Sequence, residues 1–196
     1  MTTIRTASAL AAILCASGCG PSDEEKQACT AKKNEAAEAW GALGKALATE
    51  AESVRADLVR ISQEAERTAV MEGAAGPPDP AAQAAARARM APRIALAEAR
   101  RAYVNAVDAA AGAAESLKSA YGGTAAAGVE AEAGSSSRFD SIGTTATAVA
   151  DAIRGMPAAE QGSAKAPRAD FAALRTTAQN AGQAALAACN DVDKRE

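Results

Sequence analysis

The four cysteines carry the most distinctive chemistry in this chain of 196 residues, and they are Cys15, Cys19, Cys29 and Cys189. A cysteine thiol can form a disulfide, bind a metal ion or accept a covalent modification. The chain has no histidine and no CxxC motif, which removes the usual zinc and dithiol redox sites. The cysteine pattern therefore favours disulfide formation and covalent modification over metal or redox chemistry.

The residues before Cys19 have the parts of a secretory signal peptide. Arg5 supplies a positive charge, a mostly apolar stretch follows, and small side chains precede Cys19. The segment resembles the lipobox of bacterial lipoproteins, although Ala16 stands where that family usually has leucine. The resemblance implies a signal peptide over residues 1–18, cleavage before Cys19 and a diacylglycerol anchor on the Cys19 thiol.

Two other interpretations of this segment remain open. An ordinary signal peptide could be cleaved at the same bond, because Ala16 and Gly18 satisfy the small-x-small rule. A membrane-spanning anchor is disfavoured, since the uncharged stretch between Arg5 and Asp23 has 17 residues and a membrane helix needs about 20. The lipoprotein resemblance implies an exported protein held to the bacterial envelope and facing the periplasm or the cell surface. The outer membrane is favoured over the inner one, because Gly20 rather than aspartate follows the anchor.

The remaining cysteines form a natural pair if Cys19 is acylated. Cleavage removes Cys15 and leaves Cys29 and Cys189 in an oxidising compartment, where thiols pair. We therefore expect a structural disulfide between Cys29 and Cys189. Apart from the acyl anchor, we expect no cofactor.

Alanine dominates the composition and predicts an all-α protein. The chain has 59 alanines, against 23 Val, Ile and Leu residues and five aromatic residues. Alanine is the strongest helix former, and a core of methyl groups is stable only when helices approach closely. The formal net charge of −3 at pH 7 gives no reason to expect nucleic acid as a partner.

Capping residues, glycine and proline divide the chain into segments. Ser22 with Glu25 predicts one helix N-terminus, and Asp79 followed by Pro80 predicts another. Pro92 predicts a kink or break in the second helix. The expected segments are an anchor (19–21), a long helical hairpin (22–121), a flexible linker (122–137), a helical hairpin that packs on the first (138–191) and a tail (192–196).

Apolar residues recur at helical spacing and place both paired cysteines on buried faces. The first helix repeats apolar residues at intervals of eleven, as in Cys29 and Trp40, which predicts a nearly straight helix. The second carries a heptad seam from Leu96 to Tyr121. Because Cys29 begins the first helix and Cys189 ends the last, a disulfide requires an even number of helices in an up-and-down bundle. We expect an elongated antiparallel bundle of four helices with a long first hairpin and alanine-rich seams.

The sequence has no recognisable catalytic or metal-binding constellation. Without histidine, the commonest general base and metal ligand are missing. Carboxylates such as Glu50 and Glu64 alternate with arginines on the flanks of the first helix, where we interpret them as solvated surface charges. Trp40 lies on the apolar stripe and is interpreted as a core residue. We expect neither enzyme activity nor a metal site.

Five arginines form a basic cluster on the second helix, with Glu98 as its single acid. One interpretation is a basic surface for an anionic partner, such as lipid head groups or envelope glycans. The other is pairing with acids on the flank of the first helix, among them Glu64, Glu66 and Glu72. The five arginines are Arg87, Arg89, Arg93, Arg100 and Arg101.

These features favour a non-enzymatic helical interaction or spacer module, attached to the membrane by its lipid and available to an envelope protein partner. The alternative is a ligand-binding or sensory helical bundle in the envelope. That alternative requires polar residues turned into the core, and Arg100 on the heptad seam is the clear candidate.

Overall fold

The computed structural model describes residues 20–73, 79–162, 164–168, 171–190, 192 and 194. The all-α prediction is confirmed, since this part of the chain contains helices and no strand. The expected signal peptide and Cys19 lie outside the described residues, so acylation of Cys19 stays a prediction. The helices are α1 (Asp23–Gly73), α2 (Pro80–Gly123), α3 (Ala125–Arg154), α4 (Ala158–Gln161) and α5 (Phe171–Cys189).

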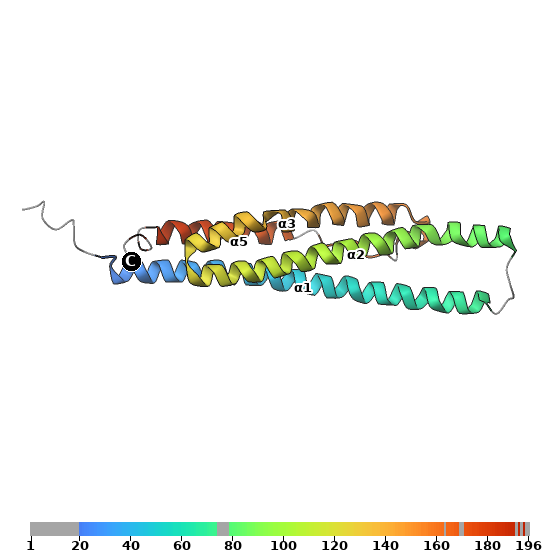
Figure 1. Cartoon of the computed structure of the whole chain (residues 1–196), viewed down its shortest axis with the longest axis horizontal. Helices are drawn as coiled ribbons and strands as arrows, with labels where there is room; N and C mark the ends of the chain where they lie inside the picture. The colour runs from blue at the N-terminus through green and yellow to red at the C-terminus, as the bar shows by residue number, and fades with distance from the viewer. Residues whose placement is uncertain are drawn as a thin grey trace, which may run out of the picture.

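The helices form a long, narrow bundle, and the distal part of α1 and α2 projects beyond the other helices (Figure 1). Both α1 and α3 pack against α2 and α5. Near the start of α1, the Lys33 ammonium donates a hydrogen bond of 2.7 Å to the carbonyl of Gly123 at the end of α2. Further along, Arg55 forms an ion pair with Asp108. The start of α1 therefore lies beside the end of α2.

Short capping sequences fix the N-termini of the first two helices. The Ser22 hydroxyl accepts a hydrogen bond of 3.2 Å from the Glu25 N–H, and the Glu25 carboxylate accepts one of 2.7 Å from the Ser22 N–H. The Asp79 carboxylate accepts one of 3.4 Å from the N–H of Ala81, with Pro80 in the first helical turn. These contacts satisfy backbone donors that a helix start leaves unpaired. Both expected caps are confirmed.

The buried seams follow the helical spacing of the sequence. Trp40 is fully buried, as expected, and its ring centroid lies 5.5 Å from that of Phe139 on α3. Between these larger residues, alanines such as Ala36, Ala51, Ala110 and Ala114 complete the contact surfaces. Buried seam residues of α1 and α2 are Cys29, Ala36, Trp40, Leu43, Leu47, Ala51, Leu96, Tyr103, Val107, Ala110, Ala114, Leu117 and Tyr121.

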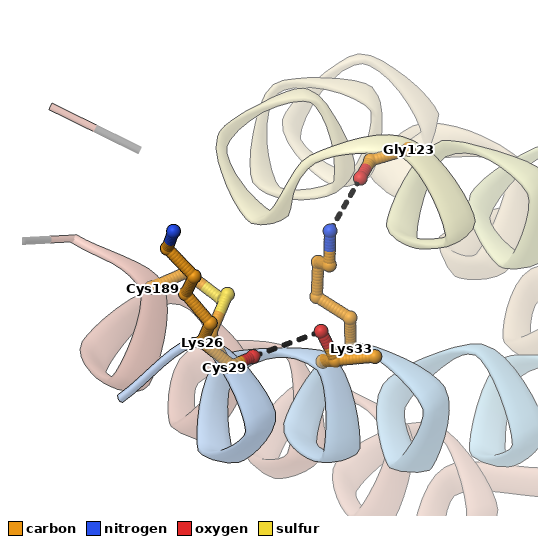
Figure 2. Close-up of a disulfide and its surroundings, with 6 residues drawn as sticks. Lys26, Cys29, Lys33, Gly123 and Cys189 are labelled. Atoms are coloured by element: carbon orange, nitrogen blue, oxygen red, sulfur yellow. Dashed lines mark hydrogen bonds between the residues drawn. A yellow bond between two sulfur atoms is a disulfide. The ribbon is translucent and has the colours of Figure 1, made fainter. Parts of the chain in front are cut away.

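Cys29 and Cys189 are joined across the bundle at the end where α1 begins (Figure 2). Their sulfur atoms lie 2.03 Å apart and their Cα atoms 4.7 Å apart, so the predicted pair is present. Both residues are buried. The cross-link joins residues separated by 160 positions, and the chain-entropy model assigns such a loop about 5 kcal/mol of stabilisation.

The flexible linker expected over residues 122–137 is wrong. Two glycines end α2, and the Thr124 hydroxyl accepts a hydrogen bond of 3.1 Å from the Ala127 N–H to begin α3 directly. The composition was misleading because alanine favours a helix wherever a partner surface is available. That surface is α2, against which α3 packs along its length. The second helical hairpin therefore begins earlier than residue 138.

The structure lacks the break that was one of the two possibilities at Pro92, and it adds one short helix to the four expected long ones. No break occurs at Pro92, which lies inside the single helix α2. Proline removes one N–H donor, but the carbonyl left without it belongs to Ala88, which is exposed and can bind water. The described residues contain five helices rather than four, because the short helix α4 forms between Pro157 and Gly162.

Tyr121 fills a space between α3 and α5 where both helices carry glycine. A Cβ atom on Gly128 would overlap the Tyr121 ring, and one on Gly182 would overlap its hydroxyl end. The hydroxyl donates a hydrogen bond of 3.2 Å to the Glu132 carboxylate. Burial, reinforced by the negative charge of Glu132, raises the pKa of Tyr121, so this donor stays protonated. Close packing at this point depends on the two glycines.

We predict that Gly128→Ala and Gly182→Ala each lower the free energy of unfolding by about 1–3 kcal/mol, because the new methyl group forces Tyr121 out of its position. Gly112→Ala is the matched control, since Gly112 lies in α2 with no atom near its Cβ position. It should stabilise the protein by up to about 1 kcal/mol. Urea unfolding followed by circular dichroism measures all three. Equal effects of Gly182→Ala and Gly112→Ala would contradict the packing.

Candidate functional site

Two charged side chains lie in the interior of the bundle. In the part of the chain whose burial is described, Glu50 is 3% exposed and Arg100 is 2% exposed, and no other charged residue is buried. Burying a charge is costly unless hydrogen bonds or an opposite charge compensate it. Both side chains contact the segment 164–168, which connects α4 towards α5. The interior of the bundle therefore contains two charged side chains, both next to the segment 164–168.

Glu50 is held by two donors from different parts of the fold. Its Oε1 accepts a hydrogen bond of 3.1 Å from the Arg168 N–H and one of 3.4 Å from the Tyr103 hydroxyl. The interpretation of Glu50 as a solvated surface charge is therefore wrong. The helical spacing placed it on a flank of α1, but the segment 164–168 crosses that flank and excludes water from it.

Arg100 is buried with only part of its donor capacity used. Its Nη2 donates a hydrogen bond of 3.2 Å to the carbonyl of Lys165, whereas its Nη1 has no partner among the described residues. The pKa of Arg100 is lowered, mainly because burial removes solvent from the guanidinium; Asp57 opposes this shift, and the neighbouring Arg60 adds to it. Arg100 matches the polar core residue that the heptad seam predicted.

A cavity of about 450 Å³ adjoins Arg100, between α1, α2 and the region around α4. Its walls are largely apolar and include Leu58, Met90 and Met156. Its volume lies within the range of small-molecule sites. The charged side chains that line it are Arg60, Glu64, Arg93, Arg100, Arg101 and Glu160.

An ion pair between α2 and α4 closes one side of this cavity. The Arg93 guanidinium donates two hydrogen bonds of 3.0 Å to the Glu160 carboxylate. The hydrogen bond from Arg93 lowers the pKa of Glu160, and the same contact raises the pKa of Arg93. The bidentate contact holds α4 against the hairpin formed by α1 and α2.

A second hollow, of about 710 Å³, lies between α3 and α5 over Leu43 and Leu47. Its charged lining residues are Asp140, Arg168 and Arg175, and Arg175 donates a hydrogen bond of 2.7 Å to the Asp140 carboxylate. The Arg175 guanidinium also lies 5.2 Å from the centroid of the Phe139 ring. These contacts pair Arg175 with residues of the wall of the hollow, although its Nε has no hydrogen-bond partner among the described residues.

The structure separates the five arginines of the predicted basic cluster. Arg87 and Arg89 are exposed on α2 and do not line the cavity, whereas Arg93, Arg100 and Arg101 do. Arg93 forms its ion pair with Glu160 of α4, and the charge of Glu64 on α1 also raises its pKa. Arg100 is interior, so these residues do not form one continuous surface. The contribution of α4 was invisible in the sequence, since its position depends on tertiary packing.

The described residues contain no group of three or more His, Cys, Asp or Glu side chains placed to hold a metal ion. Within the same residues, no helix has an apolar stretch long enough to cross a bilayer. The chemistry that the cavity offers is binding: guanidinium donors for an anion, next to apolar and methionine surface for a chain or ring.

No protein-family model, curated protein or solved structure matches the chain.

We predict that Arg100→Met does not destabilise the bundle and raises its free energy of unfolding by about 1 kcal/mol. The substitution removes a desolvated, incompletely paired charge and keeps similar volume, and such replacements are commonly neutral or stabilising. Arg87→Met on the exposed surface of α2 is the control and should change stability by less than about 0.5 kcal/mol. Urea unfolding of both variants measures the difference. A loss of more than about 1 kcal/mol on Arg100→Met would assign the residue a structural role instead.

Proposed function

We propose that this protein is an exported bacterial lipoprotein, acylated at Cys19, that acts as a non-enzymatic helical interaction or spacer module in the cell envelope. Its acyl chains hold it to the membrane, more readily the outer membrane than the inner one. The bundle then faces the periplasm or the cell surface and is available to an envelope protein partner.

One observation carries this proposal: the bundle is cross-linked at the end closest in sequence to the expected anchor. Cys29 lies ten residues after Cys19, and its disulfide to Cys189 fastens the base of the bundle. From this base, α1 extends over 51 residues, which corresponds to about 75 Å at 1.5 Å per residue. A rod of that length, fixed at its base, is suited to hold a contact surface away from a membrane.

The architecture we propose for this rod is an up-and-down, antiparallel order of the four long helices α1, α2, α3 and α5. The contact of Lys33 with Gly123 and the disulfide between Cys29 and Cys189 support it, since both bring later helix ends to the start of α1. In this arrangement the C-terminal end of α1 and the N-terminal end of α2 lie farthest from the membrane.

A second candidate function is a ligand-binding or sensory bundle. The observation that favours it is the buried Arg100 guanidinium, which has an unpartnered nitrogen and adjoins a cavity of about 450 Å³. A buried charge without a full set of partners is energetically costly. Such unfavourable charges occur preferentially at functional sites.

Metabolic labelling with a fatty-acid analogue tests the anchor. We predict that the protein is labelled and sediments with membranes, that Cys19→Ala abolishes the labelling, and that most of that variant is released from the membrane fraction. Cys15→Ala is the matched control, because Cys15 lies within the expected signal peptide, and it should leave labelling unchanged. Membrane association that persists unchanged in Cys19→Ala would remove the lipid anchor from the proposal.

Site-specific photo-crosslinking tests the interaction role. Val59 on α1 and Ile94 on α2 are the large apolar side chains that are more than half exposed in the described residues, at 55% and 53%. We predict that crosslinkers at either position capture the same envelope protein in intact cells. A crosslinker at the exposed Glu24, in the first turn of α1, is the control and should not capture it. If neither position captures a protein, the interaction role is contradicted and only the spacer role remains.

A further inference from the structure

The cavity beside Arg100 carries more positive charge than its own walls neutralise. Arg60 pairs with Glu64 at 3.0 Å and with Asp57 at 3.8 Å. Arg93 pairs with Glu160. Within the described part of the chain, neither Arg100 nor Arg101 forms an ion pair with a carboxylate, although the nearby charge of Asp57 partly offsets the lowering of the Arg100 pKa by burial. These two guanidinium groups of the lining therefore have no ion-pair partner, and the unpartnered Nη1 of Arg100 is closed to solvent in this structure.

One of these groups is desolvated before any ligand arrives. Arg100 is 2% exposed and its Nη1 has no hydrogen-bond partner among the described residues. In such surroundings an opposite charge interacts more strongly than at the surface, because water screens it less. The guanidinium geometry also suits two-point contact with a carboxylate or phosphate.

The remainder of the lining is apolar and adaptable. Leu58, Ile61 and Leu96 contribute branched side chains, and Met90 and Met156 contribute flexible thioethers. Ile94 lines the same cavity and is 53% exposed, so apolar surface continues from the cavity to solvent. A ligand that matches this lining has an apolar portion several carbon atoms long.

We infer that this cavity binds a single-chain anionic amphiphile, with its carboxylate or phosphate head at Arg100 and Arg101 and its apolar chain against the α1, α2 and α4 walls. The inference names the ligand class for the second candidate function and rests on it. It is independent of acylation at Cys19, so a failure of ligand binding leaves the anchor and the spacer role as they stand.

The α4 helix forms one side of the site in this arrangement. It has four residues and is held to α2 by the Arg93–Glu160 pair at the cavity wall. An anionic head that enters beside Arg93 competes with Glu160 for the same donors. Ligand binding therefore couples to the position of α4 and of the segment 164–168, whose Lys165 carbonyl accepts from Arg100.

Calorimetric titration of the full chain carrying Cys19→Ala tests the inference, because this variant has no acyl anchor to compete for the cavity. The probes are dodecanoate, dodecyl phosphate and dodecyltrimethylammonium, each below its micelle concentration and without other detergent. We predict that at least one anion binds with one-to-one stoichiometry and that the cation binds at least about tenfold more weakly. Tighter binding of dodecanoate would indicate a free fatty acid as the ligand, and tighter binding of dodecyl phosphate would indicate a phosphate-bearing lipid.

Two variants in the same background locate the site. Arg100→Gln should weaken anion binding by about tenfold or more, since a charge-assisted hydrogen bond is lost. Arg87→Gln removes an exposed arginine outside the cavity and should leave affinity within about twofold. Equal binding of the cation and the anions, or no effect of Arg100→Gln on a folded chain, would overturn the inference.

Should Arg100→Gln fail to fold, Ala97→Leu takes its place. Ala97 lines the cavity, and the larger side chain narrows it without changing its charge. We predict that it weakens binding of both anions by about tenfold, while its circular dichroism spectrum stays that of the parent chain. Unchanged anion affinity in Ala97→Leu would place the ligand elsewhere and overturn the inference.

Discussion

Close approach between helices is the constraint on which this bundle depends. Alanine and glycine occupy many positions between the larger core side chains, where each contributes little buried area and stability requires short distances between helices. Tyr121 illustrates the consequence: its ring and hydroxyl occupy space that exists only because Gly128 and Gly182 lack a Cβ atom. The disulfide supplements this packing at one end, where it restricts the unfolded chain rather than adding buried surface.

Local sequence signals predicted what local chemistry determines. The caps at Ser22 and Asp79, the burial of Trp40 and the pairing of Cys29 with Cys189 follow from residue type and helical spacing, and all are present. The helix in the segment 122–137 was not predictable, because a stretch rich in glycine, alanine and serine can form either a linker or a packed helix. Only the neighbouring surface of α2 decides between them, and one sequence does not reveal that surface.

The candidate site was predictable in part. Arg100 could be singled out because a charged residue on a heptad seam contradicts the apolar pattern, and such contradictions concentrate at functional positions. Its surroundings could not be predicted. Helix α4 and the segment 164–168 have little periodicity, yet they cover Glu50, accept a hydrogen bond from Arg100 and supply Glu160 to the cavity wall. These contacts arise from tertiary placement rather than from local propensity.

The cross-link between Cys29 and Cys189 also determines how the molecule carries mechanical force. A pull between the two chain ends passes from one cysteine to the other through covalent bonds, so the helices between them bear none of the tension. A pull on the distal ends of α1 and α2 takes a different route, along the helix axes and through the side-chain contacts between the helices. The base of the bundle is thus secured against such tension by a covalent bond, whereas the distal ends of α1 and α2 are held by side-chain packing.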